Sequence, residues 1–450
     1  MRQKCIIGFD VGTSSLKAAI ASQDTGQILD FYTGHYQMQE RSPGVTSCAM
    51  YVTALQKALQ KLSQSYDITA VSVATQMYSI CREIDGEMYV YQWNALWDRN
   101  PELEPTFEQD LYQSGCLNDT IFGAYKAATA VGTGFVPYGI KDYLIEYLCG
   151  QRATDMTTAS SSGLYDAFNK CWNEGFIRRI GLDTSQLSLA VVHNTPIGHT
   201  KPGLLPEPAV VAPGLGDGMS ASYACRHVSS LCGNLGTSIA VRMITDASNV
   251  VSPKESRLWT YAMDERRFLV GGISSNGFSV LHWGKDLGWN ALEQDTEDTQ
   301  QVLFLPWLYG ERVPFWSSNL RGTFLGISKD TDNRAFEGAL LKSVAFTFST
   351  MVKEMEKHTG DMLVLGGGGA NFADLVSVIS GCINADIAIL DNTDYLASIG
   401  AAISAAEAIG ITIENKLAPQ KIIKPTGRYK DEFAKWRKAA TRMAEFYEQQ

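Results

Sequence analysis

The segment DVGTSS, from Asp10 to Ser15, places short hydroxyl side chains on a glycine turn directly after an apolar, strand-like stretch. Such a turn exposes backbone N–H groups and hydroxyl donors at one point, which suits the oxygens of a phosphate. Asp10 stands at the strand end and could hold Mg²⁺ through water, because Mg²⁺ prefers oxygen ligands and keeps part of its hydration shell. By itself the segment could equally be a tight hairpin in which Asp10 caps its own turn.

A second Gly-Thr-Ser, Gly236 to Ser238, lies 224 residues further on, almost half of the 450-residue chain. Residues 8–20 and 232–244 share an apolar approach, a glycine-centred turn and an alternating apolar exit, which is typical of a hairpin. Two unrelated turns would also explain three matching residues. If the match is a repeat, two facing turns could grip a polyphosphate from both sides of a cleft.

A third glycine cluster, GGGGAN from Gly366 to Asn371, follows the apolar stretch MLVL and precedes a helix-like segment. A strand, glycines and a helix N-terminus together form a general anion or nucleotide site. Asn371 takes the place of the last glycine in GxGxxG, and the chain contains no GxxxxGK[ST], which disfavours a dinucleotide oxidoreductase and a Walker-type ATPase. The alternative is that these glycines only allow a helix to pack closely on a strand.

The elements that must position these turns recur along the chain. Strand-like stretches follow each Gly-Thr-Ser, and helix-like stretches come after them, at 49–62 in the first half and at 330–358 in the second. This order predicts an α/β fold of two domains, 1–228 and 229–450, whose mixed sheets flank a cleft. The charge and aromatic pattern of 431–448 predicts a terminal surface helix.

Composition limits the class of protein. A length of 450 residues with 45% hydrophobic residues suits two large domains, and the net charge of -10 argues against a nucleic-acid or anionic-membrane surface. The nine cysteines form no CxxC pair and indicate reduced, mostly buried thiols. There is no signal-like core, no apolar run near the ~18 residues of a membrane span and no HExxH motif. We therefore expect a cytoplasmic protein without a protein-built zinc site.

These motifs, in this order, resemble the FGGY carbohydrate kinases of the sugar-kinase, actin and Hsp70 ATPase superfamily. The resemblance covers essentially the whole chain and rests on GFDVGTSSLKAAI, LPWLYGERVPFWSSNLRGTFLGIS (Leu305 to Ser328), GGGGANFADLVSVISGCINADI and ASIGAAISAA. It implies a fold of two ribonuclease-H-like, or actin-like ATPase, domains around a catalytic cleft, with ATP and Mg²⁺ as cofactors.

The resemblance also implies roles for residues. The family's catalytic base is an aspartate in a GxxDG-like loop, matched here by APGLGDGMSAS, so Asp217 becomes the candidate base and an acceptor contact. An aspartate suits that role because it can orient the acceptor hydroxyl and accept its proton. Asp10 would lie near the Mg²⁺ and reach it through water ligands. The residues implied to contact ATP are Gly12, Thr13, Ser14, Gly236, Thr237, Gly367, Gly368, Gly369 and Asn371.

The acceptor is expected to meet the first domain. VATQMYSI resembles the family's substrate loop, so Gln76, Met77 and Tyr78 are candidates for acceptor binding. A polar and aromatic edge with one soft apolar residue fits a polyol chain. Met77 could instead be a core residue, and many relatives place a histidine or glutamate where Tyr78 stands.

Other polar residues keep two interpretations. Lys17 could bind phosphate or face solvent. Asp98 and Arg99 resemble the family's W-x-D-x-R segment at an altered spacing and could be a surface pair. Asp155, Tyr125 and Lys126 lie in family-like segments and are weaker candidates for acceptor binding.

The function implied is ATP-dependent phosphorylation of a hydroxyl on a small sugar or sugar acid, with Asp217 as base. Within the family, TSIAVRMI, RLWTYAMDERRFLVGGISSNGFSVLHW and GERVPFW are most similar to gluconate kinases and then to xylulose kinases. An anionic acceptor would place Arg99, Lys126 or Arg312 near its carboxylate. The alternatives are a kinase for xylulose or another ketose or polyol, a non-catalytic sensor, and an actin-like or Hsp70-like ATPase. The expected partner is a small molecule, with no nucleic acid and no membrane, and a homodimer stays open.

Overall fold

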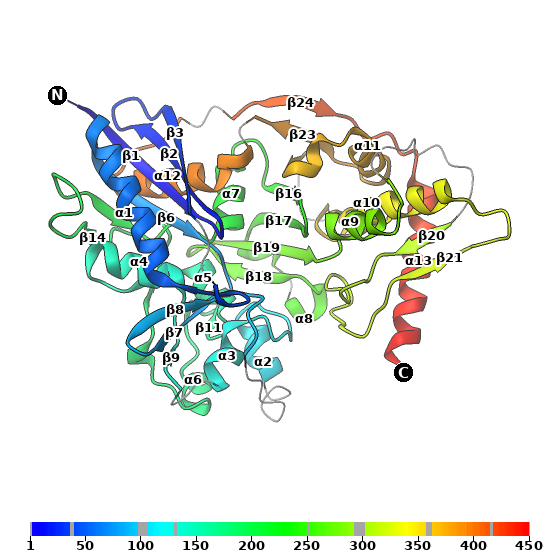
Figure 1. Ribbon diagram of the computed structural model, residues 1–450, viewed down its shortest axis with the longest axis horizontal. Coiled ribbons are helices and arrows are strands. Elements are labelled where there is room, and N and C mark those ends of the chain that lie inside the picture. The colour runs from blue at the N-terminus through cyan, green and yellow to red at the C-terminus, as the bar shows by residue number, and fades with distance from the viewer. Residues whose placement is uncertain are drawn as a thin grey trace.

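The computed structural model describes residues 2–36, 40–97, 107–129, 133–250, 252–291, 302–356, 362–391, 393–414 and 417–449. Their backbone forms one six-stranded and one seven-stranded sheet, together with helices and smaller sheets (Figure 1). The α/β class with mixed sheets predicted from the sequence is confirmed.

The first large sheet has the strand order β14-β15-β6-β1-β2-β3. These strands are β1 (Gln3–Val11), β2 (Ser15–Ser22), β3 (Ile28–His35), β6 (Tyr66–Thr75), β14 (Gly198–His199) and β15 (Val210–Ala212). β1, β2 and β3 are antiparallel neighbours, whereas β6 runs parallel to β1 and β15 runs parallel to β6. β1 and β6 are apolar on both sides because side chains from helices cover both faces of the sheet.

The second large sheet has the order β18-β19-β17-β16-β22-β23-β24. These strands are β16 (Leu231–Leu235), β17 (Ile239–Asp246), β18 (Trp259–Ala262), β19 (Arg267–Ser274), β22 (Met362–Gly366), β23 (Asp386–Leu390) and β24 (Pro419–Ile423). β16 runs antiparallel to β17 and parallel to β22, as β1 does to β2 and β6. β23 then takes the place of β15, with an antiparallel edge strand beyond each of them. The topology confirms the internal duplication predicted from the two Gly-Thr-Ser segments.

Shorter strands surround the large sheets. They are β4 (Glu40–Ser42), β5 (Val45–Ser47), β7 (Ile80–Ile84), β8 (Glu87–Tyr91), β9 (Phe135–Val136), β10 (Ala153–Asp155), β11 (Tyr165–Asp166), β12 (Cys171–Trp172), β13 (Leu189–Val191), β20 (Leu303–Leu305) and β21 (Thr323–Leu325). The short helices are α2 (Glu108–Gln113), α3 (Gly123–Thr129), α5 (Met156–Ser161), α6 (Glu174–Arg179), α8 (Pro253–Ser256) and α9 (Phe278–Asp286).

The outer helices bury apolar side chains against the sheets and against one another. α1 (Cys48–Ser65) and α4 (Ile140–Cys149) pack on one face of the first sheet. α10 (Asn333–Glu356) packs on the second sheet, and α11 (Ala373–Cys382) and α13 (Lys430–Glu448) pack against α10. α1 starts at Ser47, whose hydroxyl accepts from the N–H of Ala49. α13 buries Phe433 and Trp436 on one side and confirms the predicted terminal helix. Among the described residues, the helices lack the combination of length and apolar character that crossing a bilayer requires.

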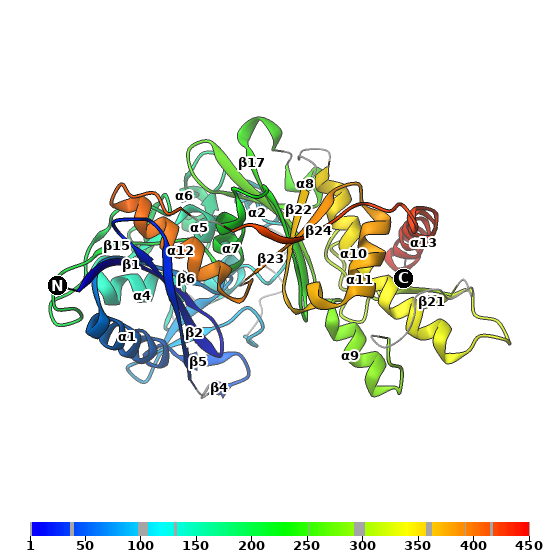
Figure 2. The ribbon, with the colours of Figure 1, turned by 90° about the horizontal axis from the view of Figure 1, so that it is seen from above.

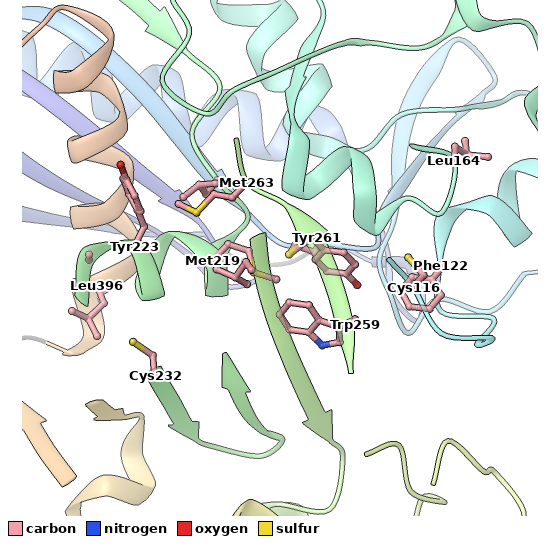
Figure 3. Packing of buried hydrophobic residues seen from close by; sticks show 14 of the residues in the cluster. Cys116, Phe122, Leu164, Met219, Tyr223, Cys232, Trp259, Tyr261, Met263 and Leu396 are labelled. Carbon is pink, nitrogen blue, oxygen red and sulfur yellow. The ribbon is translucent and has the colours of Figure 1, made fainter. Parts of the chain in front are cut away.

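Two helices form a middle layer between the large sheets. α12 (Leu396–Ala408) comes late in the chain but lies on the first sheet, against β1 and β6, as Figures 1 and 2 both show. α7 (Asp217–Cys225) packs on α12 and reaches β17 of the second sheet. The buried cluster around them includes Met219, Tyr223, Tyr261 and Leu396 (Figure 3). The middle layer therefore ties the two halves of the chain together.

Small residues allow this layer to be so thin. A Cβ atom on Gly8 of β1 would lie 1.9 Å from the backbone nitrogen of Ala402, and one on Gly400 would lie 1.9 Å from the carbonyl oxygen of Ser220. The hydroxyl of Ser72 donates to the carbonyl of Ala401 at 2.6 Å, across the same contact. Backbone therefore meets backbone where α12 crosses β1 and α7.

Replacing Gly8 with Ala should lower the free energy of unfolding by about 1–3 kcal/mol, since an added methyl group here overpacks a backbone contact that cannot open locally. Thermal unfolding with and without nucleotide measures the effect. Gly175→Ala is the matched control, because a Cβ on Gly175, in exposed helix α6, meets nothing closer than 3.7 Å. Equal midpoints for the two variants would contradict the importance of this crossing.

Candidate active site

The first Gly-Thr-Ser turn joins the central strands of the first sheet. Val11 pairs with Leu16 across it, and the N–H of Gly12 donates to the carbonyl of Ser15 at 3.0 Å. The side chains of Thr13 and Ser14 are exposed. The hydroxyl of Tyr36 donates to the carbonyl of Gly12 and holds the turn from β3's side. The turn therefore presents hydroxyl groups at the end of β1, as its sequence predicted.

The second turn occupies the same place in the second sheet but is one residue shorter. Leu235 pairs with Ile239 across it, and the N–H of Gly236 donates to the carbonyl of Ser238 at 3.2 Å. The start of α9 fastens this turn, because the N–H of Phe278 donates to the carbonyl of Gly236 at 3.0 Å. Thr237 remains exposed. The two turns are thus related by the duplication without being identical.

Asp10 ends β1 beside the first turn. Burial, together with the negative charge of Asp217, raises the pKa of Asp10 to about 7, and Lys17 opposes this rise. The amino group of Lys17 donates to the carbonyl of Asp394 at 3.0 Å and lies near the Tyr395 ring. Lys17 therefore contacts the second half of the chain, which neither sequence interpretation anticipated.

Asn234 is a residue that sequence reasoning missed. It stands 224 residues after Asp10, at the same position before its turn, so the internal alignment could have found it. Its side-chain oxygen would lie 2.7 Å from a Cβ on Gly367, and its amide nitrogen 3.5 Å from a Cβ on Gly236. Asn234 is exposed and lies between the second turn and the glycine cluster.

The glycines of the third cluster differ in what they face. A Cβ on Gly367 would lie 2.5 Å from the carbonyl oxygen of Leu235, and one on Gly369 would lie 2.5 Å from the Leu235 Cβ. Gly367 also has φ +83°, which favours glycine. Gly368 has nothing within 4 Å of its Cβ position and is exposed, as is Asn371. Close packing explains two of the glycines, whereas Gly368 and Asn371 face open space.

Asp217 is the first residue of α7 and is exposed to solvent. Its Oδ1 accepts from the N–H of Gly218 at 2.6 Å. Protein surrounds the carboxylate on its inner side, and this burial raises its pKa, while the Gly218 N–H, Arg242 and Lys141 act in the opposite direction. Because its charge also acts on Asp10, the two carboxylates share one electrostatic environment.

A buried ion pair supports the loop before Asp217. The Nζ of Lys141 lies 2.8 Å from Oδ2 of Asp155, with exposed side-chain fractions of 1% and 0%. The same Nζ donates to the carbonyl of Gly214 at 3.1 Å, where the chain has φ +65°. Burial alone would raise the pKa of Asp155, but Lys141 and the hydroxyls of Thr157 and Thr158 hold it below its usual range. Asp155 is thus placed behind the loop of Asp217.

Replacing Lys141 with Met should cost about 3–5 kcal/mol of unfolding free energy, because it leaves the Asp155 carboxylate buried and unpaired. Chemical denaturation measures the loss. Lys424→Met breaks an exposed pair with Asp386, in which the lysine is 76% exposed, and should cost less than about 1 kcal/mol. If both variants lose the same stability, the Lys141 pair does not support the loop.

The expected acceptor loop lies beside the loop of Asp217. It follows β6, and a parallel bridge joins Thr75 to Gly216. A Cβ on Gly216 would lie 2.5 Å from the sulfur of Met77, which is only 6% exposed. Met77 is therefore packed under the Asp217 loop, in agreement with the core alternative. Gln76 is buried too, and its Oε1 has no donor within the described parts of the chain.

Tyr78 links the two halves. It has φ +61°, and its hydroxyl lies 3.2 Å from that of Tyr261 on β18. Burial raises the pKa of Tyr78 to about 12. The Nζ of Lys126 donates to the carbonyl of Gln92 at 3.1 Å and to that of Tyr78 at 3.5 Å, so Lys126 holds this loop from behind.

A cavity of about 540 Å³ is lined by residues of both halves, including Tyr125, Ser275 and Arg312. Arg312 donates to the hydroxyl of Ser275 at 3.1 Å, and its Nε lies 3.5 Å from the carboxylate of Asp119. Arg312 and Tyr125 from the sequence analysis therefore meet in one space. Asp98 and Arg99 lie outside the described residues.

Three parallel strands explain how these residues meet. β1, β6 and β15 are parallel neighbours, so the Asp10 turn, the loop at 76–78 and the loop leading to Asp217 all follow the carboxyl ends of strands at one edge of the sheet. Ligands of open α/β sheets bind at this edge. The arrangement brings a phosphate-type turn, a polar loop and two carboxylates together, which suits transfer of a phosphoryl group to a hydroxyl.

Comparisons with known proteins agree with this geometry. Residues 182–409 match the model of the FGGY family of carbohydrate kinases, C-terminal domain. A gluconokinase of Bacillus subtilis (strain 168) is 27% identical over 395 residues, which cover 77% of this chain and 76% of that protein. A xylulose kinase of Lactococcus lactis subsp. lactis (strain IL1403) is 24% identical over 453 residues, covering 90% and 88%.

Solved structures show the same fold. The crystal structure of ligand-bound xylulose kinase from Lactobacillus acidophilus matches with a TM-score of 0.83 and 21% identity, over 99% of this chain and 97% of that one. The likeness spans both large sheets, and it confirms the predicted fold of two ribonuclease-H-like, actin-like ATPase domains.

Proposed function

The chain belongs to the FGGY family of carbohydrate kinases, and from this premise we propose that it transfers the γ-phosphoryl group of ATP to a hydroxyl of a small sugar acid, most readily gluconate. The observation that carries the proposal is the juxtaposition at the edge of the first sheet. Asp217, the loop at 76–78 and the Asp10 turn follow three neighbouring parallel strands.

Asp217 acts as the base. Its carboxylate is exposed at the start of α7, beside the loop that we assign to the acceptor, so an acceptor hydroxyl could donate to it. Its raised pKa favours accepting a proton late in the transfer, when the hydroxyl becomes acidic. The acceptor side is the loop of Gln76, Met77 and Tyr78, in which Met77 packs beneath the Asp217 loop and Gln76 offers a buried oxygen that needs a donor.

The nucleotide lies between the two turns. In the first turn, Gly12, Thr13 and Ser14 contact the nucleotide, with Thr13 and Ser14 near the transferring phosphoryl group. In the second turn, Gly236 and Thr237 contact the β and γ phosphates. The remaining nucleotide contacts are Gly367, Gly368, Gly369 and Asn371. Exposed hydroxyls on both turns, and open space at Gly368 and Asn371, support this assignment.

The residues present fit Mg²⁺ carried by ATP. Among the described residues, no group of three or more His, Cys, Asp or Glu side chains could hold a metal ion by itself. Asp10 and Asp217 nevertheless repel each other, so a divalent cation beside Asp10, reached through water, would relieve that repulsion. When bound, Mg²⁺ neutralises charge that develops on the phosphate oxygens.

Two domains divide the work in this proposal. Residues 1–228 supply the acceptor loop and the base, and residues 229–450 supply the second turn and the glycine cluster. The boundary falls just before β16, at the start of the second sheet. α12 belongs to the second domain by sequence and packs on the first, so it couples the two.

Gluconate is favoured over the alternative, a neutral ketose such as xylulose, by the TSIAVRMI and GERVPFW segments and by Arg312, whose charge acts on Tyr78 of the acceptor loop. The relatives include both a gluconokinase and a xylulose kinase, each at 27% identity or less. The acceptor must therefore be identified by experiment.

A coupled assay of ADP release tests the function. Gluconate, xylulose, ribulose, sedoheptulose, glycerol and erythrulose are offered with ATP and Mg²⁺, and gluconate should give the highest kcat/KM. If xylulose gives the highest kcat/KM, the acceptor is a ketose and not gluconate. If no acceptor raises ADP release above the rate with ATP alone, the protein is a non-catalytic sensor and the proposal fails.

A further inference from the structure

Arg242 lies on β17, five residues after Thr237, and its side chain reaches the loop of the proposed base. A Cβ atom on Gly218 would lie 2.4 Å from Nη2 and 2.5 Å from Cζ of Arg242. The guanidinium therefore rests on the backbone of the residue that follows Asp217. Only glycine at position 218 leaves room for it.

This guanidinium has no partner in the described parts of the chain. Its Nε is buried and makes no hydrogen bond, and no carboxylate there forms an ion pair with it. A buried donor without an acceptor is unfavourable, and more so when it is charged. Its positive charge acts on both Asp217 and Tyr78, so the guanidinium lies near the base and near the acceptor loop.

The other cations around this space are already engaged. Arg312 pairs with Asp119, Lys141 pairs with Asp155, and Lys126 donates to backbone carbonyls. Lys17 donates to the carbonyl of Asp394. Each of these four cations thus has a polar partner, whereas no hydrogen bond or ion pair of the Arg242 side chain is found among the described residues.

We propose that Arg242 binds the carboxylate of the acceptor and makes the enzyme prefer a sugar acid to a neutral polyol. This inference rests on the proposed kinase function. A guanidinium presents parallel N–H donors that match the two oxygens of a carboxylate, so it can fix both the position and the orientation of an anionic acceptor. An acceptor bound to Arg242 would lie beside Asp217, because Gly218 contacts both side chains. Its N–H donates to Asp217, and the guanidinium of Arg242 packs on its backbone.

The test compares gluconate with glucitol, the neutral alcohol of the same carbon chain. Arg242→Met should lower kcat/KM for gluconate about 100-fold, mainly through KM, because it removes one partner of a desolvated charge pair. Activity with glucitol, and KM for ATP, should change less than about threefold. Arg242→Lys keeps the charge without the paired donors and should lose about tenfold.

Binding and folding are measured separately from turnover. Gluconate should raise the melting temperature of the wild type and of Arg266→Met, an exposed control, but not that of Arg242→Met. Retained ATP binding shows that each variant is folded. If Arg242→Met phosphorylates gluconate as well as the wild type does, this inference fails while the proposed function stands. It also fails if the variant loses activity equally with gluconate and glucitol, or if its KM for ATP rises. Absence of any kinase activity in the wild type overturns the proposed function itself.

Discussion

Replacing Asp217 with Asn should lower kcat by about 10²–10⁴, the usual contribution of a general base, while leaving the affinity for ATP close to that of the wild type. The amide keeps the size of the side chain and its position at the start of α7, but it cannot accept a proton. The acceptor hydroxyl would then have to lose its proton to water. Single-turnover measurements of ADP release, with saturating acceptor, give the rate of the chemical step.

The control is Asp183→Asn, which changes an exposed aspartate that caps a short 3₁₀ turn far from the proposed site in sequence. It should retain wild-type turnover. Asp217→Glu provides a second check, since a carboxylate displaced by one methylene should restore part of the rate that Asn loses. Near-normal turnover of Asp217→Asn, with the same acceptor, would remove Asp217 from the catalytic role.

The sequence predicted those features that arise from local patterns. The shared Gly-Thr-Ser at an offset of 224 residues indicated the duplication, because the same strand–turn–strand chemistry produces the same hairpin twice. The apolar alternation around Asp10 and Gly236 likewise predicted the strands that hold the two turns. The expected helix over 49–62 is α1, Cys48–Ser65, with the difference at ends where the cap residue decides the boundary.

Contacts between distant segments could not be predicted in this way. The partners of Lys141 are Asp155 and Gly214, and Arg242 rests on Gly218, although nothing in the spacing of these residues connects them. Such contacts depend on how strands are ordered in the sheets and on where α12 packs, which are long-range properties. The sequence therefore points to Arg99, Lys126 or Arg312 as partners of an acceptor carboxylate, and nothing in it points to Arg242.

Replacing Asp10 with Asn should lower kcat at least about 100-fold and weaken binding of Mg²⁺–ATP. The amide lacks the negative charge with which, in our proposal, Asp10 binds the water ligands of Mg²⁺. The same carboxyl should give a pH dependence. With a pKa of about 7 in the free protein, Asp10 is largely protonated at pH 6 and ionised at pH 8. Since only the ionised form attracts the metal, affinity for Mg²⁺–ATP should rise as the pH rises through 7.

Calorimetry at pH 6, 7 and 8 measures this rise in affinity. The Asp10→Asn variant gives the part of the pH dependence that comes from titration of the nucleotide itself, which is then subtracted. The charge of Asp217 is one cause of the raised pKa of Asp10, so Asp217→Asn should move the inflection to lower pH. The experiment thereby tests the two carboxylates as a pair with different roles. Asp10 holds the metal through water, and Asp217 accepts the proton of the acceptor hydroxyl. An unchanged inflection in Asp217→Asn would mean that the two groups do not share the environment on which the proposed mechanism depends.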